Sequence, residues 1–86
     1  MSEAITIRHS TDRDGPRVLR LAELDNRPAP VGATLLAEVD GRLAAAVGID
    51  DGSAVADPFR PTADLVMLLH TRAEQERVNR HGRAAA

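Results

Sequence analysis

The chain has no cysteine, tryptophan, tyrosine or lysine, and Phe59 is its only aromatic residue. The lack of cysteine excludes disulfides, thiolate metal sites and a cysteine nucleophile. Without tyrosine and tryptophan, the core must consist of Leu, Val, Ile and Ala. The chain also has almost no ring on which the bases of RNA or single-stranded DNA could stack, which argues against a nucleic-acid partner.

The charge balance and the histidines exclude further classes. A formal net charge of −2 gives no electrostatic footprint for nucleic acid. His9, His70 and His81 lack the spacing of metal ligands, so we expect no metal site. The first residues lack an apolar signal-peptide core, and the apolar run at residues 65–69 is much shorter than the ~20 residues that span a bilayer. We therefore expect a cytoplasmic protein without a membrane partner.

The first quarter of the chain predicts a strand followed by a helix. Residues 4–9 alternate between apolar and polar side chains, as in a half-buried strand. Thr11 and Asp14 have the spacing of a short capping box, and Pro16 is tolerated in the first turn of a helix. Five apolar residues then cover more than half of the helix circumference: Val18, Leu19, Leu21, Ala22 and Leu24. So wide an arc indicates contact with two surfaces, such as the sheet and a neighbouring helix or subunit.

Three short strands follow a loop that is rich in proline and glycine. Residues 34–39, 42–49 and 53–56 alternate in hydrophobicity, and turn sequences at residues 40–41 and 50–52 separate them. This spacing predicts an antiparallel meander.

Two features of the meander have functional interpretations. Ala44, Ala46 and Gly48 are expected to share one face, where small side chains let a helix pack close to the strand or else leave room for a ligand. The strand at residues 53–56 is expected to lie at an edge with unpaired backbone groups. Pairing with a second copy would cover that edge, which predicts a homodimer.

The last third of the chain predicts a stiff connector and a helix. Residues 57–62 contain two prolines, and a helix begins at about Thr62. Its apolar stripe consists of Leu65, Val66, Leu68, Leu69 and Ala73. Beyond the stripe, Glu74 is expected to meet Arg77, and Glu76 to meet Arg80. The chain is thus expected to form one α/β (α+β) domain over residues 1–80, in β-α-β-β-β-α order with two helices on an antiparallel sheet, and a flexible tail over residues 81–86.

The connector contains the candidate binding residues, Arg60 and Thr62. Arg60 lies beside a helix N-terminus, where free N–H groups and the helix dipole favour an anion. The alternative is structural: Phe59 fills the gap between sheet and helix while the prolines fix the corner. His70 lies at the edge of the apolar stripe and is interpreted as a partly buried structural histidine, with a general base as the alternative.

Three stretches of the chain carry a family resemblance: Ile-Thr-Ile-Arg at residues 5–8, residues 10–24, and the segment Leu-Leu-Ala-Glu-Val-Asp-Gly-Arg-Leu-Ala-Ala-Ala-Val. They resemble the first helix and the first three strands of the GNAT family of N-acetyltransferases. The resemblance covers residues 4–56. In that family a glycine-containing Gln/Arg-x-x-Gly-x-Gly/Ala loop binds the pyrophosphate of acyl-CoA. Here residues 57–62 contain no glycine and two prolines, and the family's fifth strand and frequent tyrosine acid are missing.

The resemblance therefore implies a truncated acetyltransferase-like domain that is non-catalytic and has no cofactor. It would act as a binding or regulatory partner, as a homodimer or with another protein. The alternative is an acyl-CoA-dependent N-acetyltransferase with a site completed by a second subunit, in which Arg60 and Thr62 hold acetyl-CoA and His70 or Asp57 is the base. A third interpretation is an assembly subunit without a ligand. The catalytic residue of the acyltransferase alternative stays open between His70 and Asp57.

Overall fold

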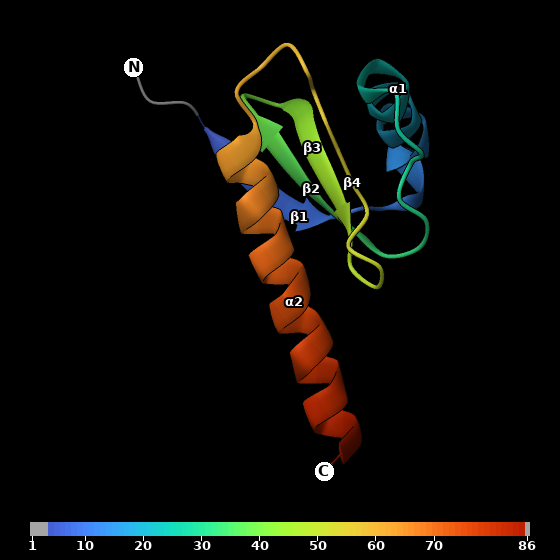
Figure 1. Cartoon of the computed structure of the whole chain (residues 1–86), viewed down its shortest axis with the longest axis vertical. Helices are drawn as coiled ribbons and strands as arrows, with labels where there is room; N and C mark the ends of the chain where they lie inside the picture. Colours follow the sequence, from blue (N-terminus) through green and yellow to red (C-terminus); the bar gives the residue numbers. More distant parts are fainter. Residues whose placement is uncertain (1–3, 86) are drawn as a thin grey trace.

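The chain folds into a four-stranded antiparallel sheet with one helix on each face (Figure 1). The computed structural model describes residues 4–85, and the side chains of residues 4–80. The elements are β1 (Ile5–His9), the 3-10 turn η1 (Asp12–Asp14), α1 (Gly15–Asp25), β2 (Thr34–Val39), β3 (Arg42–Gly48), β4 (Ala54–Ala56) and α2 (Ala63–Ala85). The predicted α+β class and the β-α-β-β-β-α order are confirmed. The expected flexibility of residues 81–86 stays a prediction.

Local sequence signals explain most element boundaries. The Thr11–Asp14 capping box is present, because the Thr11 hydroxyl accepts the Arg13 N–H at 3.3 Å and Asp14 accepts the Thr11 N–H at 2.7 Å. Asn26 ends α1 in the left-handed conformation that suits asparagine. Asp40 and Gly41 both have positive φ, as the two-residue turn between β2 and β3 requires. Within residues 4–85, no helix has the length and hydropathy of a membrane span.

The strands follow one another across the sheet in the order β1-β2-β3-β4. Alternate residues of β2 and β3 enter two separate cores. The α2 face contains Leu35, Ala37, Ala45, Val47, Ile49, Leu69 and Ala73. The α1 face contains Val18, Leu21, Ala22, Leu36, Ala46 and Val55. Both faces of the sheet are therefore covered by a helix.

A register shift interrupts the alternation of β3. Ala37 pairs with Ala45 but Glu38 pairs with Leu43, so Ala44 is an extra residue in β3. Leu43 consequently packs against the α1 core, whereas Ala44 lines a hollow on the α2 face. The expectation that Ala44 shares a face with Ala46 is wrong. At Ala46 the close-packing interpretation holds, because the core of α1 contacts this residue directly.

The helices bury narrower stripes than the sequence predicts. In α1 the side chains of Leu19 and Leu24 remain 55% and 50% exposed. In the described part of the chain, the helix therefore contacts the sheet but not the second surface, a neighbouring helix or subunit, that its wide apolar arc predicts. In α2, Leu69 is fully buried, but the predicted stripe is wrong at Leu68, which is 42% exposed. The sheet is four short strands wide, and a straight helix that crosses it can bury only one side of its surface.

A charged cluster joins β1, α1 and β2 and was not predicted. The Arg8 guanidinium donates two hydrogen bonds of 2.8 Å to the buried Asp14 carboxylate and one of 3.0 Å to Glu38. Arg17 donates to Glu38 at 2.8 Å and to Asp14 at 3.3 Å. Hydrogen bonds from Arg8 and from the Thr11 N–H hold the pKa of Asp14 well below its usual range. Hydrogen bonds from Arg17 and Arg8 lower the pKa of Glu38.

The second half of α2 contacts the sheet through polar groups. Glu76 lies 2.7 Å from His9 Nε2, and Arg80 donates to Asp50 at 3.2 Å. Arg77 donates to the carbonyl oxygen of Ile49. The expected pairs of Glu74 with Arg77 and of Glu76 with Arg80 are therefore wrong, because Glu76, Arg77 and Arg80 bond to groups outside the helix.

Two neighbouring leucines test the packing of α2. We expect Leu69→Ala to lower the free energy of unfolding by about 2–5 kcal/mol, because it leaves a cavity in the core. Leu68→Ala removes the same atoms from a half-exposed site and should cost less than about 1 kcal/mol. Urea denaturation followed by circular dichroism measures both. Equal losses would contradict the orientation of α2.

The charged cluster of Arg8, Asp14, Arg17 and Glu38 predicts how the stability of the fold depends on pH. The lowered pKa values of Asp14 and Glu38 mean that both carboxylates stabilise the fold above their ordinary pKa values of 3.8 and 4.5. This stabilisation is lost as the pH falls through the lower folded-state values. Asp14→Asn should reduce the stability at pH 7 and flatten its decline below about pH 5. Denaturation at a series of pH values measures both effects, with Asp12→Asn as the exposed control. An Asp14→Asn profile parallel to the wild type would refute the assignment.

Candidate functional site

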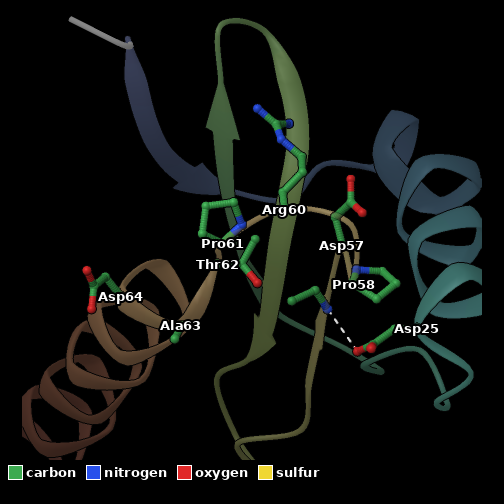
Figure 2. A pocket seen from close by; sticks show the side chains of 9 residues that line it. Asp25, Asp57, Pro58, Arg60, Pro61, Thr62, Ala63 and Asp64 are labelled. Carbon is green, nitrogen blue, oxygen red and sulfur yellow. Dashed lines mark hydrogen bonds between the residues drawn. The ribbon is translucent and has the colours of Figure 1, made fainter.

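The connector, residues 57–62, links β4 to α2 in a constrained conformation (Figure 2). The Asp57 carboxylate accepts the Phe59 N–H at 2.9 Å, and the Arg60 N–H points to the Asp57 carbonyl oxygen at 3.4 Å. The Thr62 carbonyl oxygen accepts the Val66 N–H at 2.9 Å, which is the first bond of α2. The connector is therefore a turn closed by a side chain and followed directly by a helix.

A shallow hollow of about 440 Å³ lies at this corner. Its lining residues come from the connector and from the ends of α1, β4 and α2: Asp25, Ala56, Asp57, Pro58, Arg60, Pro61, Thr62, Ala63 and Asp64. The structure thus brings the predicted residues Arg60 and Thr62 together with Asp57. His70, the other candidate base, does not line this hollow.

The charge of the hollow is negative. Three carboxylates, those of Asp25, Asp57 and Asp64, line it together with the single guanidinium of Arg60. The side chains do not converge: Figure 2 shows Arg60 and Asp64 extending in different directions. Among the described residues, no group of three or more His, Cys, Asp or Glu side chains could hold a metal ion.

The residues of this corner do not fit the phosphates of acyl-CoA. Pro61 has no N–H to donate to a phosphate oxygen. Asp64, in the first turn of α2, already places a negative charge at the positive end of the helix dipole. A pyrophosphate would meet three carboxylates and the guanidinium of Arg60. Arg27 Nε lies 3.8 Å from one of these carboxylates, that of Asp25, so repulsion still outweighs attraction here.

A second, narrower hollow of about 220 Å³ lies on the other side of the connector. Apolar side chains from the sheet and from α2 form part of its wall, and Arg60, Pro61, Thr62 and Asp64 line both hollows. Val39, Ala44 and Leu65 are among its apolar lining residues. These side chains, and not Phe59, line the space between the sheet and the start of α2.

Phe59 is 82% exposed, so the expectation that it plugs the gap between sheet and helix is wrong. Its backbone N–H is fixed by Asp57, and the turn directs the side chain into solvent. The chain therefore exposes its only aromatic side chain.

His70 is also exposed, which contradicts the expectation of a partly buried histidine. It lies over the turn between β3 and β4, where a Cβ atom added to Gly52 would be 3.9 Å from His70 Cε1. No carboxylate contacts it within the described residues, so the structure offers no partner that would make it a general base.

The edge of β4 is not as open as expected. The Ala56 N–H, which points away from β3, donates to the Asp25 carboxylate at 3.0 Å (dashed in Figure 2). No local pattern in the sequence predicts this bond, because Asp25 belongs to α1 and lies 31 residues away. Asp64 also lines the hollow and is absent from the predicted site residues. Its position could be predicted, since acidic residues are common in the first turn of a helix.

A scan against protein-family models and searches of curated proteins and of solved structures found no match to this chain.

Proposed function

We propose that the chain is an acetyltransferase-like domain of the GNAT type that performs no acyl transfer and instead binds another protein. The exposed Phe59 carries this proposal: the only aromatic side chain of the protein lies 82% exposed on the connector. Aromatic residues are enriched among the few that supply most of the binding energy at protein interfaces.

The conformation of the connector supports this role. Pro58 and Pro61 flank Phe59 and Arg60 in the sequence, and the Asp57 carboxylate fixes the Phe59 N–H. Binding would therefore order few additional backbone torsions, which lowers the entropic cost of association. A flexible loop with the same side chain would bind more weakly.

The charges around Phe59 favour a particular partner chemistry. The carboxylates of Asp25, Asp57 and Asp64 line the adjacent hollow. A partner surface with an apolar pocket for Phe59 and arginine or lysine side chains at its rim would complement both features. A second copy of this chain and a different protein are both compatible with this chemistry.

Titration with acetyl-CoA tests the absence of acyl-CoA chemistry. Because Pro61 of the connector has no N–H to donate and the adjacent hollow is acidic, we expect no binding tighter than about 100 μM by isothermal titration calorimetry. Tighter binding that Arg60→Ala abolishes would overturn the proposal. It would instead support an acyl-CoA-dependent N-acetyltransferase with a site completed by a second subunit.

Replacement of Phe59 tests the binding role. Phe59→Ala should change the free energy of unfolding by less than about 0.5 kcal/mol, because the side chain is exposed. The variant should lose partner proteins that the wild-type chain captures on a column. Val31→Ala is the matched control, since Val31 is 83% exposed on another loop. Equal capture by the wild type and Phe59→Ala would contradict the role of Phe59.

A further inference from the structure

The two edges of the sheet differ in how they are protected. β4 has three residues, its Ala56 N–H is bound by Asp25, and Pro58 follows closely in the connector. Short strands, prolines and covered backbone groups are the usual means by which proteins prevent pairing at an edge. β1, at the other edge, has five residues and no proline, and within residues 4–85 it pairs only with β2.

The ladder between β1 and β2 shows which groups of β1 point outward. The Asp40 N–H donates to the Ala4 carbonyl oxygen at 2.8 Å, and the Ser10 N–H donates to Thr34 at 2.8 Å. The hydrogen-bonded pairs of an antiparallel ladder occur at every second residue. The even-numbered residues of this segment therefore bond to β2, and the odd-numbered residues of β1 direct their N–H and C=O groups away from the sheet.

These outward groups belong to Ile5, Ile7 and His9. Among residues 4–85, only the His9 carbonyl oxygen has a partner, the Arg8 side chain at 3.1 Å. The remaining three N–H groups and two C=O groups form a regular row along the edge. The Ile5 side chain beside this row is 52% exposed.

The row is complementary to itself. If a second β1 lies antiparallel with the two-fold axis at Ile7, Ile7 faces Ile7 of the second copy and Ile5 faces His9 of the second copy. The Ile7–Ile7 pair and the two Ile5–His9 pairs are all hydrogen-bonded pairs in this register, so both strands satisfy their outward groups. In the same register Thr6 faces Arg8 of the second copy, and no like charges are directly opposite.

The charges of the strand do not oppose this pairing. Arg8 is neutralised by Asp14 and Glu38, and His9 contacts Glu76. Two copies of the edge therefore approach without an unpaired cation on either strand.

We propose that two copies of this chain pair through β1, antiparallel about a two-fold axis at Ile7, to form one continuous eight-stranded sheet. The proposal goes beyond the binding function proposed above, because it concerns the edge of β1 and not the surface at Phe59. It replaces β4 by β1 as the pairing edge. Acetyl-CoA binding would overturn the proposed function without affecting this dimer, and a monomeric chain would overturn the dimer without affecting binding through Phe59.

Backbone N-methylation at single residues tests the proposal. N-methyl-Ile7, introduced by chemical ligation, removes one outward donor and places a methyl group on the edge without altering the side chain or the ladder to β2. N-methyl-Ala54 is the matched control, because Ala54 occupies the equivalent outward position on β4. Size-exclusion chromatography with light scattering and refractive-index detection measures the mass, since the chain has no Trp or Tyr for absorbance at 280 nm.

The wild type and N-methyl-Ala54 should have twice the 9.2 kDa mass of one chain at about 100 μM, and dimerisation of N-methyl-Ile7 should weaken at least about tenfold. A monomeric wild type, a dimeric N-methyl-Ile7, or disruption by N-methyl-Ala54 alone would each overturn the proposal.

If N-methyl-Ile7 does not fold, amide hydrogen exchange of the wild type decides. Exchange at Ile5 and Ile7 should slow as the concentration rises from about 1 to about 100 μM, and unchanged exchange would overturn the proposal.

Discussion

The small side chains of β3 are the constraint on which the rest of the structure depends. Ala45 and Ala46 are fully buried on opposite faces of this strand, one under α2 and the other under α1. A core without aromatic residues gains its stability from close approach of the layers, and small side chains at the centre permit that approach. Because both faces are covered, the surfaces that remain for a partner among the described residues are the edges of the sheet, the loops and the outer sides of the helices.

Charged side chains at the two edges of the sheet determine which edge keeps unpaired backbone groups. Asp14 ends the 3-10 turn η1 directly before α1 and binds Arg8 of β1, so one carboxylate joins the first strand to the first helix. Asp25, at the other end of α1, protects the edge of β4. The two ends of α1 therefore act on opposite edges of the sheet. At β1 the Asp14 carboxylate neutralises the Arg8 side chain and leaves the backbone of the strand uncovered. At β4 the Asp25 carboxylate binds the backbone itself.

Local signals predicted the elements, and long-range contacts explain the errors. The Thr11–Asp14 capping box and the Asp40–Gly41 turn depend on neighbouring residues, so the sequence indicates them directly. Periodicity identified α2 but not which leucines it buries, because its crossing over the sheet determines that. At the candidate site, Arg60 and Thr62 line one hollow, but the carboxylate of Asp25 arrives from a distant helix. Such contacts arise from tertiary structure and leave no local pattern.

The central claim is that two copies of this chain pair through the open edge of β1. Intermolecular nuclear Overhauser effects in a sample mixed from isotope-labelled and unlabelled chains test it most directly. In the proposed register, Thr6 and Arg8 of the second copy form a non-hydrogen-bonded pair, in which the two Hα atoms lie close together. The account predicts an intermolecular cross-peak between these Hα atoms. Intermolecular cross-peaks at Ala54 of β4, or none at all, would contradict it.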